Sequence, residues 1–256
     1  MKERSILMTG ESVCGIIDLR KTHTRRLIKP QPCLLDSGIW YPSNIPGDFR
    51  NKTGKHYANE EHMRKGLAID FCHYGKPGDL LWVRETWRPG AWREDGRLAI
   101  DYRASPELTN TPWVTIPDDE LGEKFEKLWI KLTDELLALG LKSGEDDRFH
   151  WKPGKCPLKW RPSIFMPRWA SRITLKITNV RVERLVDISP HDAVQEGFAN
   201  YCQYGDPVIG GIPTLIMTKA PIQRFAEYWN KINTKRGYSW NNNPWVWVIE
   251  FEKVEG

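Results

Sequence analysis

The C-terminal segment Trp245-Val246-Trp247-Val248-Ile249-Glu250-Phe251 constrains the fold more than any other part of the sequence. Apolar side chains occupy both of its alternating faces, and a strand at the surface of a sheet would leave one of those faces in water. We therefore predict a strand inside a sheet or barrel. The chain also contains 13 Trp, and some of these must serve a core because a surface with so many indole rings would aggregate.

Turn and capping residues delimit the other predicted elements. Thr9 is a candidate N-cap, and Ser189, Pro190 and Gly197 suit the cap, first turn and end of a short helix. In chain order we predict a strand at 6–8, a helix from Thr9 to about Leu19, a strand at 78–87, and at 171–185 either one long strand or two strands with a bend near Asn179. A helix at 189–197 and an amphipathic helix with Ile222, Phe225, Trp229 and Ile232 on one stripe follow.

Single helices are scattered among these strands without a βαβ rhythm, which predicts the α+β class. The strands are few and strongly apolar, so closure into a small barrel is plausible. The length of 256 residues fits one domain, 1–256. Two stretches read as insertions: 35–70 as loop, and 106–150 with a helix whose apolar face carries Leu121, Phe125, Leu128, Leu132 and Leu139.

The composition and the short motifs limit the expected cellular compartment and the expected cofactors. Five cysteines without regular spacing argue against a disulfide framework and favour a reducing compartment. The sequence shows neither a signal segment nor an apolar run of about 18 residues, so we expect a cytoplasmic protein without a membrane partner. It contains no CxxC or HxxxH pair for a metal, and no Walker loop or GxGxxG for a nucleotide, so we expect no metal and no cofactor.

Positive charge is concentrated near the N-terminus. The net charge of +5 is in itself a weak indication of nucleic-acid binding, but residues 20–29 hold five basic residues and no acidic one. We therefore predict a basic groove there. The predicted nucleic-acid contacts are Arg20, Arg25, Arg26, Arg84, Trp87, Arg168 and Arg172.

Four segments, in this order, resemble the ASCH branch of the PUA-like superfamily. DLRKTHTRR at 18–26 is similar to the family's GRKTxTxR element, and PGDLLWV at 77–83 to its GDxLxV turn and strand. AVQEG at 193–197 and WVIEF at 247–251 complete the match. The longer frame resembles phage and prophage proteins of this type, which would place the protein in a host cytoplasm. The insertions are not covered, Leu19 replaces the family's Gly, and His23 fills a variable position.

The resemblance implies a PUA-like small β-barrel flanked by helices, with a cleft for a nucleobase or RNA. It also implies one of two hydrolytic activities, cleavage of the acyl amide of N4-acylated cytidine or ribonuclease action, or RNA binding alone. In the amidohydrolase branch a Lys, a Thr and a Glu act together, and the matching positions are Lys21, Thr24 and Glu196.

The chemistry of this trio sets conditions on the fold. A threonine hydroxyl needs a base, and Lys21 can serve only if burial or nearby arginines lower its pKa. Lys21 and Thr24 would face opposite ways within one strand, so Lys21 must lie in the turn before it. Glu196 at a helix C-terminus opposes the helix dipole by about 0.3–1 kcal/mol, and a cation such as Lys21 would compensate.

Structural readings compete with each of these roles. The basic segment can be a solvated face, Thr24 an ordinary strand residue and Glu196 a surface helix residue, while Glu85 next to Arg84 suggests a strand salt bridge. For the whole protein we keep three hypotheses open. These are a hydrolase on a modified cytosine or on RNA, a non-catalytic reader of RNA or modified DNA, and an interaction protein that docks a partner through 106–150.

Overall fold

The computed structural model describes residues 1–41, 56–92, 97–105, 113–117, 123–145, 148–151, 155–198, 203–204, 215–216 and 220–254. The chain is α+β, as predicted, and it divides into two compact units. The first unit comprises Met1–Arg4, Gly15–Leu81 and Leu175–Gly256, and the second comprises Ser5–Cys14 and Trp82–Thr174. The expectation of one domain stays a prediction. Within the described ranges, no helix has the length and apolar character needed to cross a membrane.

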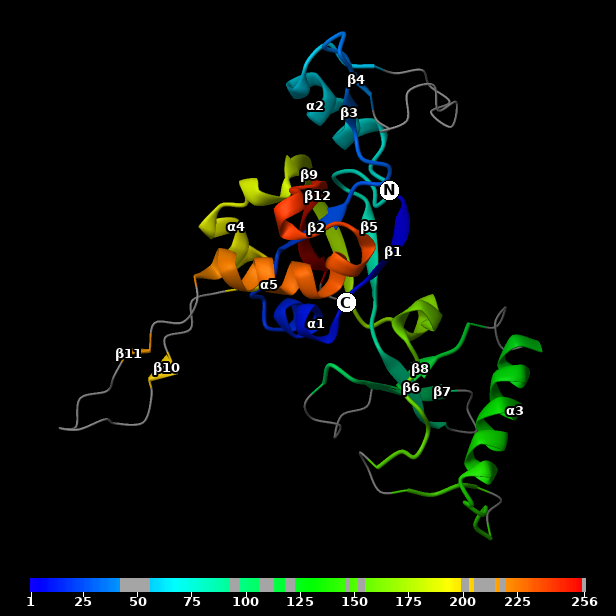
Figure 1. The fold of residues 1–256 in the computed structure, drawn as a ribbon. Helices are drawn as coiled ribbons and strands as arrows, with labels where there is room; N and C mark the ends of the chain where they lie inside the picture. Colours follow the sequence, from blue (N-terminus) through cyan, green and yellow to red (C-terminus); the bar gives the residue numbers. More distant parts are fainter. Residues whose placement is uncertain are drawn as a thin grey trace, which may run out of the picture. The chain divides into compact units, whose positions relative to one another are not determined.

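Figure 1 shows the elements along the chain. The strands are β1 (Glu3–Leu7), β2 (His23–Leu27), β3 (Cys33–Leu34), β4 (Trp40–Tyr41), β5 (Leu80–Arg84), β6 (Trp87–Trp92), β7 (Arg97–Tyr102), β8 (Trp113–Thr115), β9 (Thr174–Arg184), β10 (Gln203–Tyr204), β11 (Leu215–Ile216) and β12 (Trp245–Val254). The helices are α1 (Gly10–Ile17), α2 (Glu60–Asp70), α3 (Glu123–Ala138), α4 (Pro190–Gln195) and α5 (Pro221–Asn233), and short 3-10 turns include η1 (Ser163–Phe165) and η2 (Arg168–Ala170).

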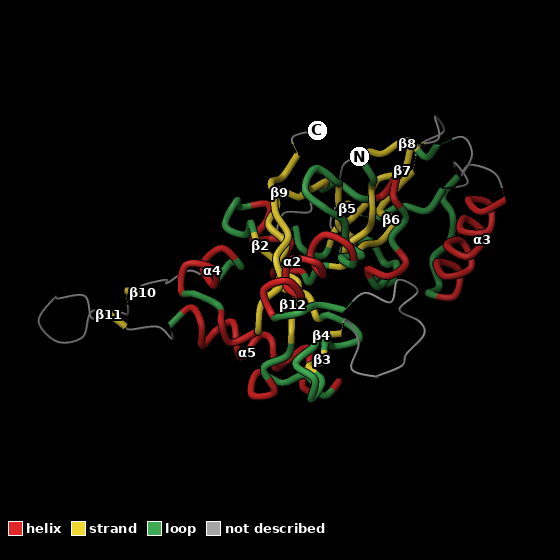
Figure 2. Tube along the Cα trace, turned by 90° about the horizontal axis from the view of Figure 1, so that it is seen from above, coloured by secondary structure: helices red, strands yellow, loops and turns green. Residues whose placement is uncertain are grey.

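The main sheet has five strands in the order β1-β5-β9-β12-β2. Strand β12 is internal, between β9 and β2, which confirms the prediction from its two apolar faces (Figure 2). It pairs with β2 in antiparallel register from Val246 opposite Leu27 to Glu250 opposite His23. This register sets which side chains of β2 share a face with which side chains of β12.

Helices α4 and α5 pack on one face of this sheet. Phe225 and Trp229 of α5 form a buried cluster with Ala193 of α4 and with Val246 and Val248 of β12. Helix α4 begins and ends as its cap residues predict: the Ser189 side chain accepts a hydrogen bond from the Asp192 N–H at 3.0 Å, and the φ of Gly197 is 98°. Helix α5 buries Phe225 and Trp229 of the predicted apolar stripe. These two helices therefore confirm the sequence prediction.

The remaining boundaries shift by a few residues. The first strand covers Glu3–Leu7 instead of 6–8, and the predicted strand 78–87 is split between β5 and the start of β6. Strand β9 is continuous, but the alternation of buried and exposed side chains is interrupted in its middle. Thr178 and Asn179 are both exposed, so the buried positions shift by one residue between Ile177 and Val180. This change lies where the bend was predicted.

The second unit contains the three-stranded sheet β6-β7-β8. Its core joins Trp87 and Tyr102 to Met166, while α3 packs Leu132 and Leu136 against Leu158.

Three sequence expectations need correction. The stretch 35–70 is not all loop, because it contains β4 and α2. Leu139 lies beyond the end of α3 and is 48% exposed, so it does not belong to the predicted apolar face, while Leu121 and the Phe125 side chain lie outside the described residues. None of the four sheets formed by the described residues is closed into a barrel. The predicted small β-barrel is therefore not observed as a closed structure.

Candidate functional site

The turn between α1 and β2 places Lys21 outside the strand. The backbone N–H groups of Arg20 and Lys21 both donate to the carbonyl oxygen of Gly15, at 2.8 and 2.9 Å. Leu19 completes the turn with a φ of 57°, a left-handed conformation that favours glycine. Lys21 thus lies in the turn before β2, which is the condition derived from the sequence. The alternation of side chains along β2 therefore does not fix the direction of Lys21 relative to Thr24.

Lys21 and Glu196 form a buried ion pair between residues 175 positions apart. The Lys21 Nζ lies 2.6 Å from Glu196 Oε2 and also donates to the Glu196 carbonyl oxygen at 2.9 Å. Both side chains are 3% exposed. Because Glu196 directly follows α4, the ammonium satisfies a carbonyl at the helix C-terminus as well as the carboxylate. The predicted compensation of Glu196 by Lys21 is confirmed.

Burial lowers the pKa of the Lys21 ammonium from its ordinary value of 10.5, because the charged form is poorly solvated there. Glu196 opposes this effect, while Arg26 and Arg25 reinforce it. Gly15 makes the burial sterically possible, since a Cβ added at Gly15 would lie 3.1 Å from the Lys21 Cβ. The electrostatic condition for a lysine base is therefore also present.

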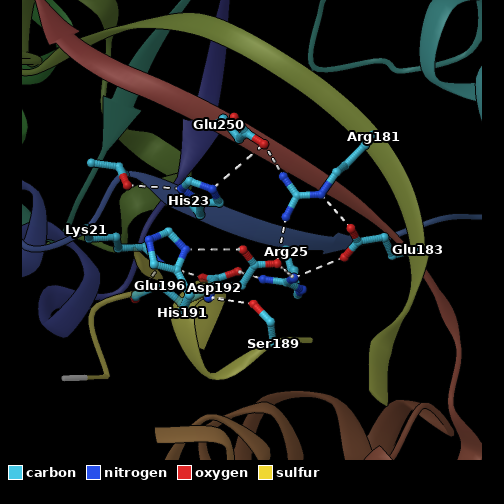
Figure 3. A network of polar contacts seen from close by, with 11 residues as sticks. Lys21, His23, Arg25, Arg181, Glu183, Ser189, His191, Asp192, Glu196 and Glu250 are labelled. Carbon is cyan, nitrogen blue, oxygen red and sulfur yellow. Dashed lines mark hydrogen bonds and ion pairs between the residues drawn. The ribbon is translucent and has the colours of Figure 1, made fainter. Parts of the chain in front are cut away.

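Arg25 is the centre of the surrounding ion network (Figure 3). Its guanidinium is fully buried and contacts Asp192 at 2.8 Å, Glu183 at 3.1 Å and Glu196 at 3.4 Å. It also lies 5.9 Å from the centroid of the Phe225 ring in α5. The donors of Arg25 thus face three carboxylates, and its predicted contact with nucleic acid stays a prediction.

Arg181 and His23 extend the network along the same face of the sheet. Arg181 contacts Asp192 at 2.7 Å and forms an ion pair with Glu250. His23 Nε2 lies 3.8 Å from Glu250 Oε1, and burial lowers the pKa of His23. We did not predict Arg181, Glu183 and Asp192 from sequence. A usable signal was present in β9, where Arg181 and Glu183 put opposite charges on the same face, next to the buried Val180 and Val182.

Thr24 faces the other side of β2. It is 4% exposed, lies opposite Ile249 in β12 and alternates with Arg25. Arg26 shares this face, and its cross-strand partner is Trp247. Among the described residues the Thr24 hydroxyl makes no hydrogen bond to Lys21 or Glu196. Two of the three predicted catalytic residues are thus in contact, while Thr24 is buried beside Arg25 but not bonded to them.

The face that carries Thr24 also holds a buried donor. The indole ring of Trp247 is 2% exposed, and within the described part of the chain its Nε1–H meets no acceptor. A buried N–H without a partner costs about 1–3 kcal/mol unless water or a ligand satisfies it. Arg26 stands opposite Trp247 and also lowers the pKa of Lys21. The Trp247 indole N–H is therefore a buried donor without an acceptor among the described residues of this face.

The other predicted nucleic-acid contacts have mixed surroundings. Arg20 is at the surface and bonds Asp18 at 2.7 Å. In the second unit Arg172 binds Glu85 through two contacts of 2.9 and 3.1 Å and also donates to Ser105 at 2.6 Å. The expected Arg84–Glu85 salt bridge is therefore wrong, because Glu85 pairs with Arg172.

The remaining three residues of that set, Trp87, Arg84 and Arg168, also belong to the second unit. Trp87 is 2% exposed in the core of the second unit, so its ring is not available to stack on a base. Arg84 instead donates to the carbonyl oxygens of Ser163, at 3.1 Å, and Ile164. Arg168 is exposed and donates to Thr174 at 3.3 Å.

Metal ligands do not gather in the described ranges: no group of three or more His, Cys, Asp or Glu side chains there is arranged to hold an ion. Comparison of the chain with protein-family models, with curated proteins and with solved structures found no match.

Proposed function

We propose that this protein hydrolyses the exocyclic amide of a modified nucleobase such as N4-acylated cytidine, with Lys21 and Glu196 as its proton-transfer pair. The observation that carries the proposal is the buried contact of 2.6 Å between the Lys21 Nζ and the Glu196 carboxylate. Burial and the neighbouring Arg26 and Arg25 lower the pKa of Lys21, which is the direction that a lysine base needs. The resemblance to ASCH proteins supports the same assignment and carries with it the PUA-like fold and a cytoplasmic location.

The proposed reaction begins with attack of the Thr24 hydroxyl oxygen on the acyl carbonyl carbon. This step requires Lys21 to have released its ammonium proton to solvent, and it requires the Thr24 hydroxyl, which makes no hydrogen bond to Lys21 in this structure, to reach the amine. The hydroxyl proton then passes to the Lys21 amine, which Glu196 orients through the contact with its Oε2. When the C–N bond breaks, the ammonium returns that proton to the departing exocyclic amine. Water then attacks the Thr24 ester and releases the carboxylic acid, so that one water is consumed in the complete reaction.

Donors on the Thr24 face would bind the substrate. A cytosine ring and its acyl group both carry carbonyl oxygens, which need N–H donors when they are taken out of water. The Trp247 indole N–H is such a donor, and Arg26 is its cross-strand neighbour. A guanidinium there would also stabilise the oxyanion that develops during attack.

Incubation with N4-acetylcytidine tests the proposal, with chromatography to detect released cytidine and acetate. We expect turnover by the natural chain and a loss of about 10²–10⁴-fold in Lys21→Ala and Glu196→Gln. Thr24→Val should abolish turnover, and Thr24→Ser should restore part of it. Lys176→Ala is the matched control, because this lysine forms an exposed ion pair with Glu252. Absence of cytidine with the natural chain, or equal turnover by Lys21→Ala, would refute the assignment.

A further inference from the structure

Positive charge is also concentrated in a second segment, which belongs to the second unit. Residues 148–174 contain no Asp or Glu and carry the basic residues Arg148, Lys152, Lys155, Lys159, Arg161, Arg168 and Arg172. Since the whole chain has a net charge of only +5, the rest of the chain is net negative. Five aromatic residues, Phe149, Trp151, Trp160, Phe165 and Trp169, are interspersed among these cations. This pattern is typical of segments that contact nucleic acid.

The arginines of the second unit differ in how their charge is neutralised. Arg88 contacts Asp101 at 3.0 Å and Arg172 contacts Glu85 at 2.9 Å, so each has a carboxylate partner. Arg84 donates to the carbonyl oxygens of the η1 turn, and its guanidinium lies 5.4 Å from the centroid of the Trp82 ring. Carbonyl and ring partners hold the guanidinium in place without cancelling its charge. Arg84 thus keeps a fixed positive charge beside η1.

The η1 turn itself presents large apolar side chains to water. Phe165 is 69% exposed and Ile164 is 56% exposed. Arg168 in η2, three residues after Phe165, lies 6.0 Å from the same Trp82 ring that Arg84 covers. The exposed Phe165 thus directly follows the two carbonyl oxygens that Arg84 binds, and both Arg84 and Arg168 lie against the Trp82 ring.

We infer that Phe165, Arg84 and Arg168 form a docking surface for single-stranded nucleic acid. A base stacks on the exposed Phe165 ring, and the two guanidinium groups contact the phosphates on either side. Single strands fit better than duplexes, because only an unpaired base exposes the π-face that an aromatic side chain can cover. This inference does not depend on the proposed hydrolysis, because none of the three residues belongs to the Lys21 site.

Fluorescence anisotropy with a labelled single-stranded oligonucleotide of about ten nucleotides, in a salt series, tests the inference. We expect binding at low salt that weakens steeply as salt rises. Stacking contributes about 1–3 kcal/mol for each base, so Phe165→Ala should weaken binding by about 5–150-fold, and Phe165→Trp should retain it. Arg168→Gln should reduce the salt slope by about one unit.

The controls separate this surface from other exposed side chains and from the hydrolase site. Ile69→Ala removes an equally exposed apolar side chain, and Lys65→Gln an exposed cation, in the first unit, and both should bind like the natural chain. Phe165→Ala should hydrolyse N4-acetylcytidine like the natural chain, which separates a failure of this surface from a failure of the Lys21 site. Four results would each overturn the inference. These are absence of binding at low salt, equal binding by Phe165→Ala, equal affinity for a duplex, and Phe165-dependent binding to anionic lipid vesicles in place of the oligonucleotide.

Discussion

Removing Lys21 should destabilise the fold far more than removing an exposed lysine. In Lys21→Met the Glu196 carboxylate, 3% exposed, loses its partner at 2.6 Å, and the Glu196 carbonyl loses a donor at 2.9 Å. Breaking a buried pair from one side costs about 3–5 kcal/mol. Arg25 remains 3.4 Å from the other carboxylate oxygen, so we expect the lower part of this range, about 3 kcal/mol.

The double variant Lys21→Met/Glu196→Gln supplies the decisive comparison. Because it removes both charges, it should be more stable than the sum of the two single changes predicts, by about 2 kcal/mol or more. Urea unfolding followed by tryptophan fluorescence measures all four proteins, and Lys176→Met serves as the exposed control, expected within about 0.5 kcal/mol of the natural chain. A loss below about 1 kcal/mol in Lys21→Met, or strict additivity in the double variant, would refute the buried, coupled pair.

Three further predictions concern other parts of the chain. Leu19→Gly should stabilise the protein by up to about 1 kcal/mol, because relief of the left-handed backbone, about 1–2 kcal/mol, exceeds the entropic cost of glycine; a lower urea midpoint in this variant would contradict the reasoning. Hydrogen bonds, chiefly from the Lys2 N–H, lower the pKa of Asp79 to about 2. The contribution of this carboxylate to the free energy of unfolding is therefore complete above pH 3.8 and disappears as the pH falls through about 2. Asp79→Asn should flatten the acid side of the curve of stability against pH, and an unchanged slope would exclude this role. Trp87→Ala should cost about 3–5 kcal/mol because the ring is in the core of the second unit, and a loss under about 1 kcal/mol in thermal unfolding would be incompatible with that position.

Local features of the chain could be predicted from the sequence alone. The cap residues around α4, the apolar stripe of α5 and the two apolar faces of β12 predicted two helices and an internal strand, and all three are observed. Helix caps and periodicity act within a few residues, so their physical content is present in any short window of sequence. The same reasoning set the condition that Lys21 lie in the turn after the first helix, and it predicted that a cation near Glu196 would compensate its charge.

Partners and burial were decided by the tertiary structure. Arg25 is a buried centre of three carboxylates and not a surface cation, because β9 and α4 bring Glu183 and Asp192 to it from positions more than 150 residues away. Glu85 likewise pairs with Arg172 and not with its sequence neighbour Arg84. The amino-acid sequence gives the formal charge of each side chain. The solvation of that side chain and the identity of its counter-ion depend on which distant segments pack against it.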